Sequence, residues 1–138
     1  MTSVKQLDDT WKNLPWKKFR KIVFRLQRRI FAAQKSDNRT LVIKLQKLLM
    51  SSKAAQWLAI RQVTQLNTGK RTSGIDGKTA LTTKERIKLH ETLNKHWKQW
   101  KHKSLKRVYI PKADGKQRGL GIPTIADRAY QCLSLIHI

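Results

Sequence analysis

The stretch of residues 10–36 constrains the fold of this chain more than any other feature of its sequence. It contains nine Lys and Arg residues and no acidic residue. Its apolar side chains recur at steps of three and four, at Trp16, Phe19, Val23, Leu26 and Ile30. This period predicts an amphipathic helix with one apolar stripe and a basic remainder.

Basic charge is in excess throughout the chain. Of 138 residues, 31 are Lys or Arg and 8 are Asp or Glu, so the formal net charge is +23 at pH 7. Such a charge repels itself unless a polyanion lies against it. Nucleic acid is therefore the first expected partner, an anionic membrane surface the second and an acidic protein the third. Hydrophobic residues make up 39% of the chain, too many for a disordered tail, so we expect one domain or part of a larger one.

Cysteine content and hydropathy exclude several classes of protein. Cys132 is the single cysteine, which excludes a disulfide framework and a CxxC zinc pair. No apolar run approaches the roughly 18 residues of a membrane span. Residues 1–9 carry two acids and no apolar core of a secretory signal. These features predict a soluble cytoplasmic protein in a reducing compartment, with no membrane span.

Capping signals divide the next part of the chain into further helices. Asp37 or Asn38 can cap a second helix, and Ser51 or Ser52 a third. The apolar positions are Leu41, Leu45, Leu48 and Leu49 in the second helix, and Ala55, Leu58, Ala59, Val63 and Leu66 in the third. The Asn-Thr-Gly sequence at 67–69 should end the third helix with left-handed geometry.

Residues 67–79 hold three glycines and no hydrophobic period, which indicates a functional loop or a boundary. Thr82, followed three positions later by Glu85, is typical of a capping box and predicts a further helix. The apolar positions of that helix are Ile87, Leu89, Leu93 and Trp97. It should fade near Trp100, where His and Lys residues crowd together.

A β-hairpin is predicted around Asp114-Gly115, which is a strong short-range turn signal. The alternating apolar residues are Val108, Ile110, Leu120 and Ile122. They predict antiparallel strands at residues 105–111 and 117–122. Thr124, with Asp127 three positions on, then opens a last helix.

The hairpin turn should bring Lys112, Lys116 and Arg118 to one end of a stiff ribbon. A guanidinium fork beside a compact ammonium suits a triphosphate or a phosphate backbone. The alternative is a solvated turn in a chain that is rich in lysine everywhere.

Two strings of the sequence carry a family resemblance. They are WLAIRQVTQLNTGKRTSGIDG, at residues 57–77, and RVYIPKADGKQRGLGIPTIADR, at residues 107–128. The second resembles the first fingers motif of group II intron-encoded reverse transcriptases, and the first resembles the N-terminal extension motif that precedes it. The resemblance covers most of the chain from about residue 10. It implies a mainly α fold with a small antiparallel β-hairpin, as an N-terminal helical extension plus a partial fingers subdomain.

The resemblance implies roles for residues of both motifs. In this family the hairpin Lys and Arg contact the triphosphate of the incoming nucleotide, which points to Lys112 and Arg118. The loop resembles the segment that lies over the template strand, with Lys70 and Arg71 as expected phosphate contacts. Gly119 stands where the family usually has Pro, so the hairpin should be less rigid.

The full set of expected nucleic-acid contacts is basic and spans four segments. Its members are Lys17, Lys18, Arg20, Arg25, Arg28, Arg29, Lys70, Arg71, Lys98, Lys101, Lys103, Lys106, Arg107 and Lys116. Trp97 and Trp100 lie among lysines and could stack on unpaired bases. The alternative is that one Trp closes the core, with Trp97 buried and Trp100 partly exposed. His90, His96 and His102 do not have a zinc spacing and are expected at the surface. We expect no metal site in this chain.

Reverse transcriptases hold two divalent metals on palm aspartates, one pair in a Tyr-x-Asp-Asp turn that this sequence lacks. The aspartates present are scattered among expected caps and turns. We therefore expect no catalytic residue here and no polymerase activity from this chain alone. The resemblance implies Mg²⁺ for the full-length enzyme.

The expected organisation has four parts. Residues 1–9 form a flexible terminus, 10–104 a helical domain that includes the loop 67–79, and 105–132 the start of the fingers. Residues 133–138 match what a transposon-end adapter encodes in one frame, so we hypothesise a non-native tail and a longer native chain.

Three readings remain open at this point. The first is the RNA- and template-binding N-terminal part of a group II intron reverse transcriptase and maturase. Its partners would be intron RNA, template-primer nucleic acid, and the palm and thumb of the same polypeptide, with no membrane partner. The second is a stand-alone basic RNA-binding module. The third takes the helix of residues 10–35 as a membrane-surface anchor, because it is amphipathic and basic.

Overall fold

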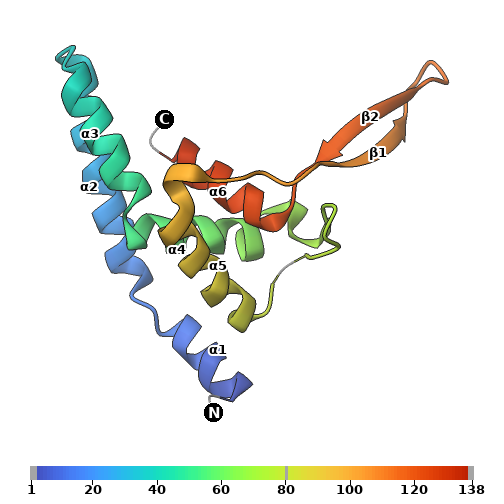
Figure 1. Ribbon diagram of the computed structural model, residues 1–138, viewed down its shortest axis with the longest axis horizontal. Helices are drawn as coiled ribbons and strands as arrows, with labels where there is room; N and C mark the ends of the chain where they lie inside the picture. The colour runs from blue at the N-terminus through green and yellow to red at the C-terminus, as the bar shows by residue number, and fades with distance from the viewer. Residues whose placement is uncertain (1–2, 80, 137–138) are drawn as a thin grey trace.

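The computed structural model describes residues 3–79 and 81–136. The protein is mainly helical with one two-stranded antiparallel sheet (Figure 1), which confirms the predicted fold class. Its elements in order are α1 (Val4–Lys12), α2 (Trp16–Lys35), α3 (Arg39–Met50), α4 (Lys53–Arg61), η1 (Gln62–Leu66), η2 (Thr68–Arg71), α5 (Thr83–His96), η3 (Trp97–Gln99), β1 (Lys106–Pro111), β2 (Gln117–Ile122) and α6 (Ile125–Leu135). Of these, η1 is a π-helix, and η2 and η3 are 3-10 helices.

The N-terminal part differs from the expected flexible terminus, because residues 4–9 belong to α1. Ser3 and Gln6 form a capping box that begins this helix. Asn13 ends α1, and Pro15 occupies the N-cap of α2. The residue before a proline is disfavoured in helical geometry, so the helix predicted from residue 10 is two helices. The Ser-x-x-Gln spacing was the signal that sequence reasoning missed.

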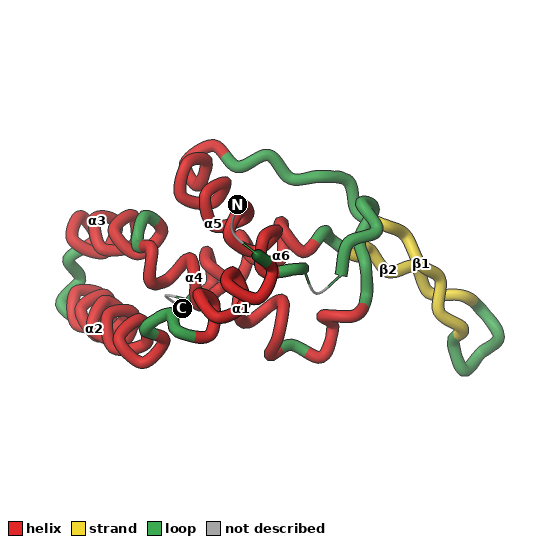
Figure 2. The backbone as a smooth tube through the Cα atoms, turned by 90° about the horizontal axis from the view of Figure 1, so that it is seen from below, coloured by secondary structure: helices red, strands yellow, loops and turns green. Residues whose placement is uncertain are grey.

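The long helices α2 and α3 lie side by side and antiparallel (Figures 1 and 2). Together with α4 and the end of α6 they enclose a first core. Its buried side chains are Val23, Leu26, Ile30, Ala33, Val42, Leu45, Leu49, Ala54, Ala55, Ala59 and Leu133. Asn38, rather than Asp37, caps α3 by accepting from the Leu41 amide.

The expected core face of α3 is wrong in part. Leu41 and Leu48 are 38% and 48% exposed, whereas Val42 is buried. The buried positions Val42, Leu45 and Leu49 form a face that is rotated from the stripe of leucines. Apolar residues surround this helix, so period alone could not choose the face that meets α2.

The end of the third predicted helix is also corrected. Ser52 caps α4 as one of the two expected residues, and α4 then passes into the π-helix η1. Asn67 has φ −74°, and Gly69 is not among the described residues with positive φ. Neither residue therefore supplies the left-handed cap that was expected at the end of this helix. The π turn shifts the register of the last residues, which leaves Leu66 exposed rather than in the core.

A second core joins α1, α4, η1, α5 and α6. Its buried side chains are Trp11, Ile60, Val63, Leu81, Leu89, Leu93, Ile125 and Ala129. The predicted capping box of Thr82 and Glu85 begins α5, and the Thr124 side chain caps α6 by accepting from the Asp127 amide. Both caps are confirmed.

His90 corrects the expectation of a surface histidine. It is 8% exposed, and its ring stacks on Trp57 with the centroids 3.9 Å apart. Trp97 and Trp100 are both half-buried. The expected burial of Trp97 is therefore wrong, whereas Trp100 is partly exposed as expected and packs against the second core.

The hairpin of β1 and β2 projects away from the helices in both views (Figures 1 and 2). Val108 faces Leu120 and Ile110 faces Arg118 across the strands, which confirms the predicted turn. Tyr109 and Ile110 are exposed.

We expect the backbone amides of the hairpin to exchange with solvent much faster than those of α4 and α5. A two-stranded ribbon without a covering layer is marginally stable and opens locally. Hydrogen exchange followed by mass spectrometry measures this directly. Equal protection of strands and core helices would contradict the expectation.

Candidate nucleic-acid interface

The predicted pair of cations lies at the tip end of the hairpin. Arg118 lies in β2, opposite Ile110 in the strand register. Lys112 directly follows β1, which ends at Pro111. Strand alternation continued by one residue would put its side chain on the side of Arg118. Both are exposed, as is Lys116.

The turn itself is held by short-range hydrogen bonds. The Lys112 amide donates to the Lys116 carbonyl at 2.6 Å and the Gly115 amide to the Lys112 carbonyl at 3.1 Å. Asp114 accepts from the Lys116 amide, and Gly115 has φ +81°. The turn therefore fixes the backbone beneath the cations while leaving their side chains free to meet a ligand.

The base of the hairpin carries Lys106 and Arg107, opposite Ile122 and Gly121, and both cations are exposed. At Gly119 an added Cβ would lie 3.6 Å from the Tyr109 ring. This is an ordinary van der Waals distance, so the position of Tyr109 does not require glycine at residue 119.

The loop of residues 67–79 carries the next two predicted cations. Arg71 is exposed. The Lys70 ammonium is half-buried and donates to the Gln65 carbonyl at 3.1 Å, so it stabilises the end of η1 as well. Contacts of either residue with nucleic acid stay a prediction.

Arg128 joins this loop to α6. Its Nη1 donates to the Gly69 carbonyl at 2.9 Å, its Nη2 to the Thr72 carbonyl at 2.6 Å and its Nε to the Pro123 carbonyl at 3.0 Å. Burial lowers the pKa of the Arg128 guanidinium, and the charge of Asp76 opposes that shift. One side chain thus ties the loop of residues 67–79 to the start of α6.

Gly74 brings the two motifs into backbone contact. A Cβ at this position would lie 2.7 Å from both the Pro123 carbonyl oxygen and the Thr124 nitrogen. Only glycine allows so close an approach. Sequence reasoning treated Gly74 as a loop residue and missed this contact.

Asp127 makes a second connection from the same turn of α6. It is 2% exposed. One carboxylate oxygen accepts from Trp100 Nε1 and the other from the Lys103 amide, each at 2.9 Å. His102 Nδ1 lies 3.6 Å from the first oxygen. Sequence reasoning placed Asp127 in a cap only, and its side chain instead holds the segment that leads into β1.

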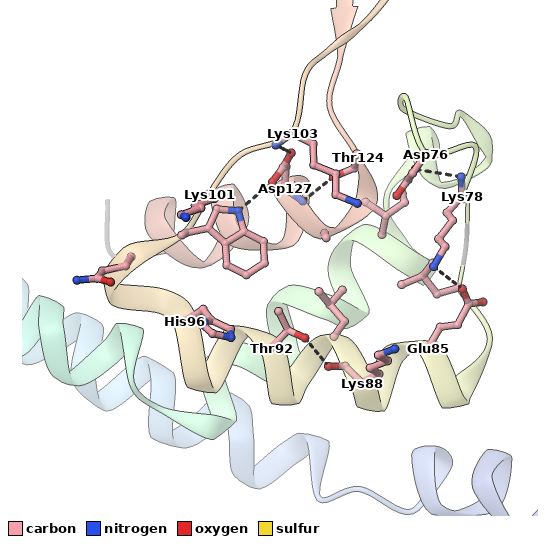
Figure 3. Close-up of a pocket in the computed structure, with 16 residues that line it drawn as sticks. Asp76, Lys78, Glu85, Lys88, Thr92, His96, Lys101, Lys103, Thr124 and Asp127 are labelled. Carbon is pink, nitrogen blue, oxygen red and sulfur yellow. Dashed lines mark hydrogen bonds and ion pairs between the residues drawn. The ribbon is translucent and has the colours of Figure 1, made fainter.

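A cavity of about 620 Å³ lies between α5, α6 and the segments around Lys78 and Lys101 (Figure 3). Leu81, Leu89, Trp100, Ile125 and Ala126 form its apolar lining. Of its charged groups, Glu85 is 3.4 Å from the Lys78 ammonium. Lys101 and Lys103 are exposed residues of its lining, as is Asp76.

The six predicted cations of α2 lie on a different part of the molecule from the hairpin (Figure 1). Lys17, Lys18, Arg20, Arg25, Arg28 and Arg29 are all exposed. Phe24 and Phe31 are 58% and 67% exposed on the same helix, and the Arg28 guanidinium lies 5.8 Å from the Phe24 ring centroid. The last predicted cation, Lys98, lies 5.5 Å from the Trp97 ring centroid.

The described residues include no group of three or more His, Cys, Asp or Glu side chains that could hold a metal ion. Asp76 and Asp114 accept from backbone amides in turns, and Asp8 accepts from the Thr83 hydroxyl. Within the same residues, no helix is long and apolar enough to cross a membrane.

The predicted non-native tail, residues 133–138, lies only partly within the described residues. Residues 137–138 lie outside the part of the chain that the structure describes. Leu133 is buried in the first core, and the Ile136 carbonyl accepts from Gln27.

Comparison with known proteins identifies relatives along most of the chain. It is 39% identical over 123 residues to "Maturase-like protein 1" of Euglena gracilis, covering 89% of this chain and 27% of the relative. It is 31% identical over 118 residues to "Maturase-like protein 1" of Euglena longa, covering 86% of this chain and 26% of that protein. Protein YkfC of Escherichia coli strain K12 is 36% identical over 96 residues, covering 64% and 24% of the two chains.

The chain thus spans about a quarter of the length of these relatives. The family model described as the N-terminal domain of reverse transcriptase matches residues 11–93, which include α2 to α4, the loop of residues 67–79 and most of α5. The chain therefore belongs to the family of reverse transcriptase N-terminal domains.

Proposed function

We propose that this chain is the RNA- and template-binding N-terminal part of a group II intron reverse transcriptase and maturase. The observation that carries the proposal is the contact between the two motifs, made by Arg128 and Gly74. It places the loop of residues 67–79 against the root of the hairpin, so a single nucleic acid could meet cations from both.

The charge distribution supports the proposal. Basic side chains are exposed on α2, in the loop, in the lining of the cavity and along the hairpin. Interactions of this kind with phosphates supply much of the affinity of proteins for nucleic acids. The relatives that match most of this chain are named maturase-like, which fits an RNA partner.

In the complete enzyme we assign the hairpin pair to the incoming nucleotide. Lys112 and Arg118 are both exposed at the tip end of the hairpin, where a guanidinium fork and an ammonium can contact a triphosphate. Phosphoryl transfer itself would depend on Mg²⁺ held by palm aspartates of the longer polypeptide, in keeping with the need to neutralise the reacting oxygens.

The affinity of the chain for a structured RNA should fall steeply with salt. Each neutralised phosphate releases counterions and contributes roughly −0.9 for duplex, or −0.7 for single strands, to the slope of log K against log salt. Fluorescence anisotropy across a salt series measures this slope. A flat response would contradict the proposal.

A pair of matched double variants separates the two basic regions. Lys112→Gln with Arg118→Gln removes the hairpin pair, and Lys17→Gln with Lys18→Gln removes two exposed charges of α2. Each double variant should lower the magnitude of the slope by up to the contribution of about two phosphate contacts. If only the α2 variant changed the slope, the hairpin would not be part of the RNA interface.

A stand-alone RNA-binding module is the second candidate. It is favoured by the two cores, since Leu49, Leu93 and Leu133 are fully buried by this chain's own elements. Sequencing the complete open reading frame distinguishes the candidates. A downstream Tyr-x-Asp-Asp turn supports the enzyme, and a natural stop codon after Ile138 supports the module.

A further inference from the structure

The direction of the hairpin depends on its two ends, because the strands project from the helical body. β2 ends at Ile122 and is followed directly by Pro123 and by Thr124, the N-cap of α6. That end is therefore attached covalently to α6. The other end, before β1, needs a separate attachment to fix the orientation of the hairpin relative to the helices.

Asp127 supplies an attachment at the β1 end. Its buried carboxylate accepts from the Lys103 amide, three residues before β1, and from the Trp100 indole. The Trp100 ring also stacks on Tyr130 of α6, with the centroids 5.1 Å apart. Hydrogen bonds that satisfy a buried charge are strong and directional, so this carboxylate holds the start of the hairpin against α6.

Arg128, the next residue, acts on the loop of residues 67–79. Its guanidinium donates to the Gly69 and Thr72 carbonyls, on either side of Lys70 and Arg71. The planar fork reaches two carbonyls at once, which a lysine ammonium cannot reproduce with the same geometry. The backbone that carries both cations is therefore held against the same turn of α6.

We propose that Asp127 and Arg128 are positioning residues that hold the hairpin and the loop in one fixed relation, so that Arg71 and Arg118 engage the same nucleic acid. This inference rests on the proposed function. Neither positioning residue needs to touch the ligand. Their effect is to present two sets of cations at a constant separation, which lowers the ordering cost of binding.

A double-mutant cycle tests the proposed role of Arg128 in positioning the loop, using the full 138-residue chain. The probe is a fluorescent RNA template annealed to a DNA primer. Arg71→Gln should weaken binding about tenfold in the wild-type background, the factor expected for one hydrogen bond to a charged group. In the Arg128→Lys background the same change should cost about threefold or less, because the loop no longer holds Arg71 at the ligand.

A second double-mutant cycle of the same design tests the proposed role of Asp127 in positioning the hairpin. Arg118→Gln should cost less in the Asp127→Asn background than in the wild type, since an amide offers one acceptor oxygen where the carboxylate offers two. The control is Lys17→Gln with Lys18→Gln on α2. Its cost should be the same in all three backgrounds, because α2 is not attached through α6 residues 127 and 128.

A distance measurement gives a readout that does not depend on RNA. Spin labels at Arg71→Cys and Lys116→Cys, in a Cys132→Ala background, should give one narrow distance distribution. Arg128→Lys and Asp127→Asn should each broaden it, while thermal unfolding shows that the helices remain folded.

The outcomes separate the two hypotheses. Salt-dependent binding with unchanged costs in every background, or an unchanged distance distribution, would overturn the positioning role and leave the proposed function intact. Absence of salt-dependent binding by the wild-type chain would overturn the proposed function, whereas the distance measurement would still report on the attachment.

Discussion

Replacing Gly74 by alanine is expected to lower the free energy of unfolding by about 1–3 kcal/mol, the usual range for inserting a methyl group where there is no room. The new Cβ would lie 2.7 Å from Pro123 and Thr124 backbone atoms. Backbone cannot rotate away as a flexible side chain can, so the loop must separate from the N-terminus of α6. Chemical denaturation followed by circular dichroism measures the change.

Gly69→Ala is the matched control in the same loop. A Cβ there would meet only the Arg128 guanidinium, at 4.0 Å, and should change stability by less than about 1 kcal/mol. If the two variants were equally stable, the close packing of the loop on Pro123–Thr124 would be refuted. Loss of stability in Gly74→Ala should be accompanied by weaker RNA binding, because Arg71 depends on the position of this loop.

Stability is expected to fall between about pH 6.5 and pH 4 through His90. Burial lowers the pKa of His90 from 6.5 to about 4, and the charge of Lys53 acts in the same direction, whereas contact with the Lys53 backbone opposes it. The unfolded chain therefore takes up this proton first as the pH falls. At roughly 1.4 kcal/mol per pK unit, the contribution lost by pH 4 is about 3 kcal/mol.

The measurement is the free energy of unfolding across that pH range. His90→Gln removes the titrating group and should abolish most of the pH dependence, at the expense of the stack on Trp57. His96→Gln, at an exposed position of the same helix, is the matched control variant. A profile that is the same in all three proteins would rule out His90 as its source.

The sequence correctly predicted those elements whose ends are set by contacts within four residues. The capping box of Thr82 and Glu85, and the Thr124 cap, lie where the sequence placed them. The Asp114-Gly115 turn likewise sets the hairpin register. Each of these depends on contacts between near neighbours, which composition and spacing report directly.

Elements that depend on distant partners were predicted less well. Val42 rather than Leu41 is buried in the first core, because packing against α2 determines which face of α3 is buried. His90 is buried because Trp57 of α4 lies against it. The spacing of histidines along α5 contains no information about that partner.

The sequence by itself determined the mainly helical fold class, the hairpin and the family, since hydrophobic period, turn chemistry and motif order are local properties of the chain. It also identified a set of cations, of which all but Lys70 are exposed. The tertiary structure alone decided how these cations are grouped. It separates α2 from the hairpin. Through Arg128 and Gly74 it joins segments about 50 to 60 residues apart along the chain, and through Asp127 it joins segments 24 and 27 residues apart. Contacts across such separations depend on how helices pack, which no local pattern encodes.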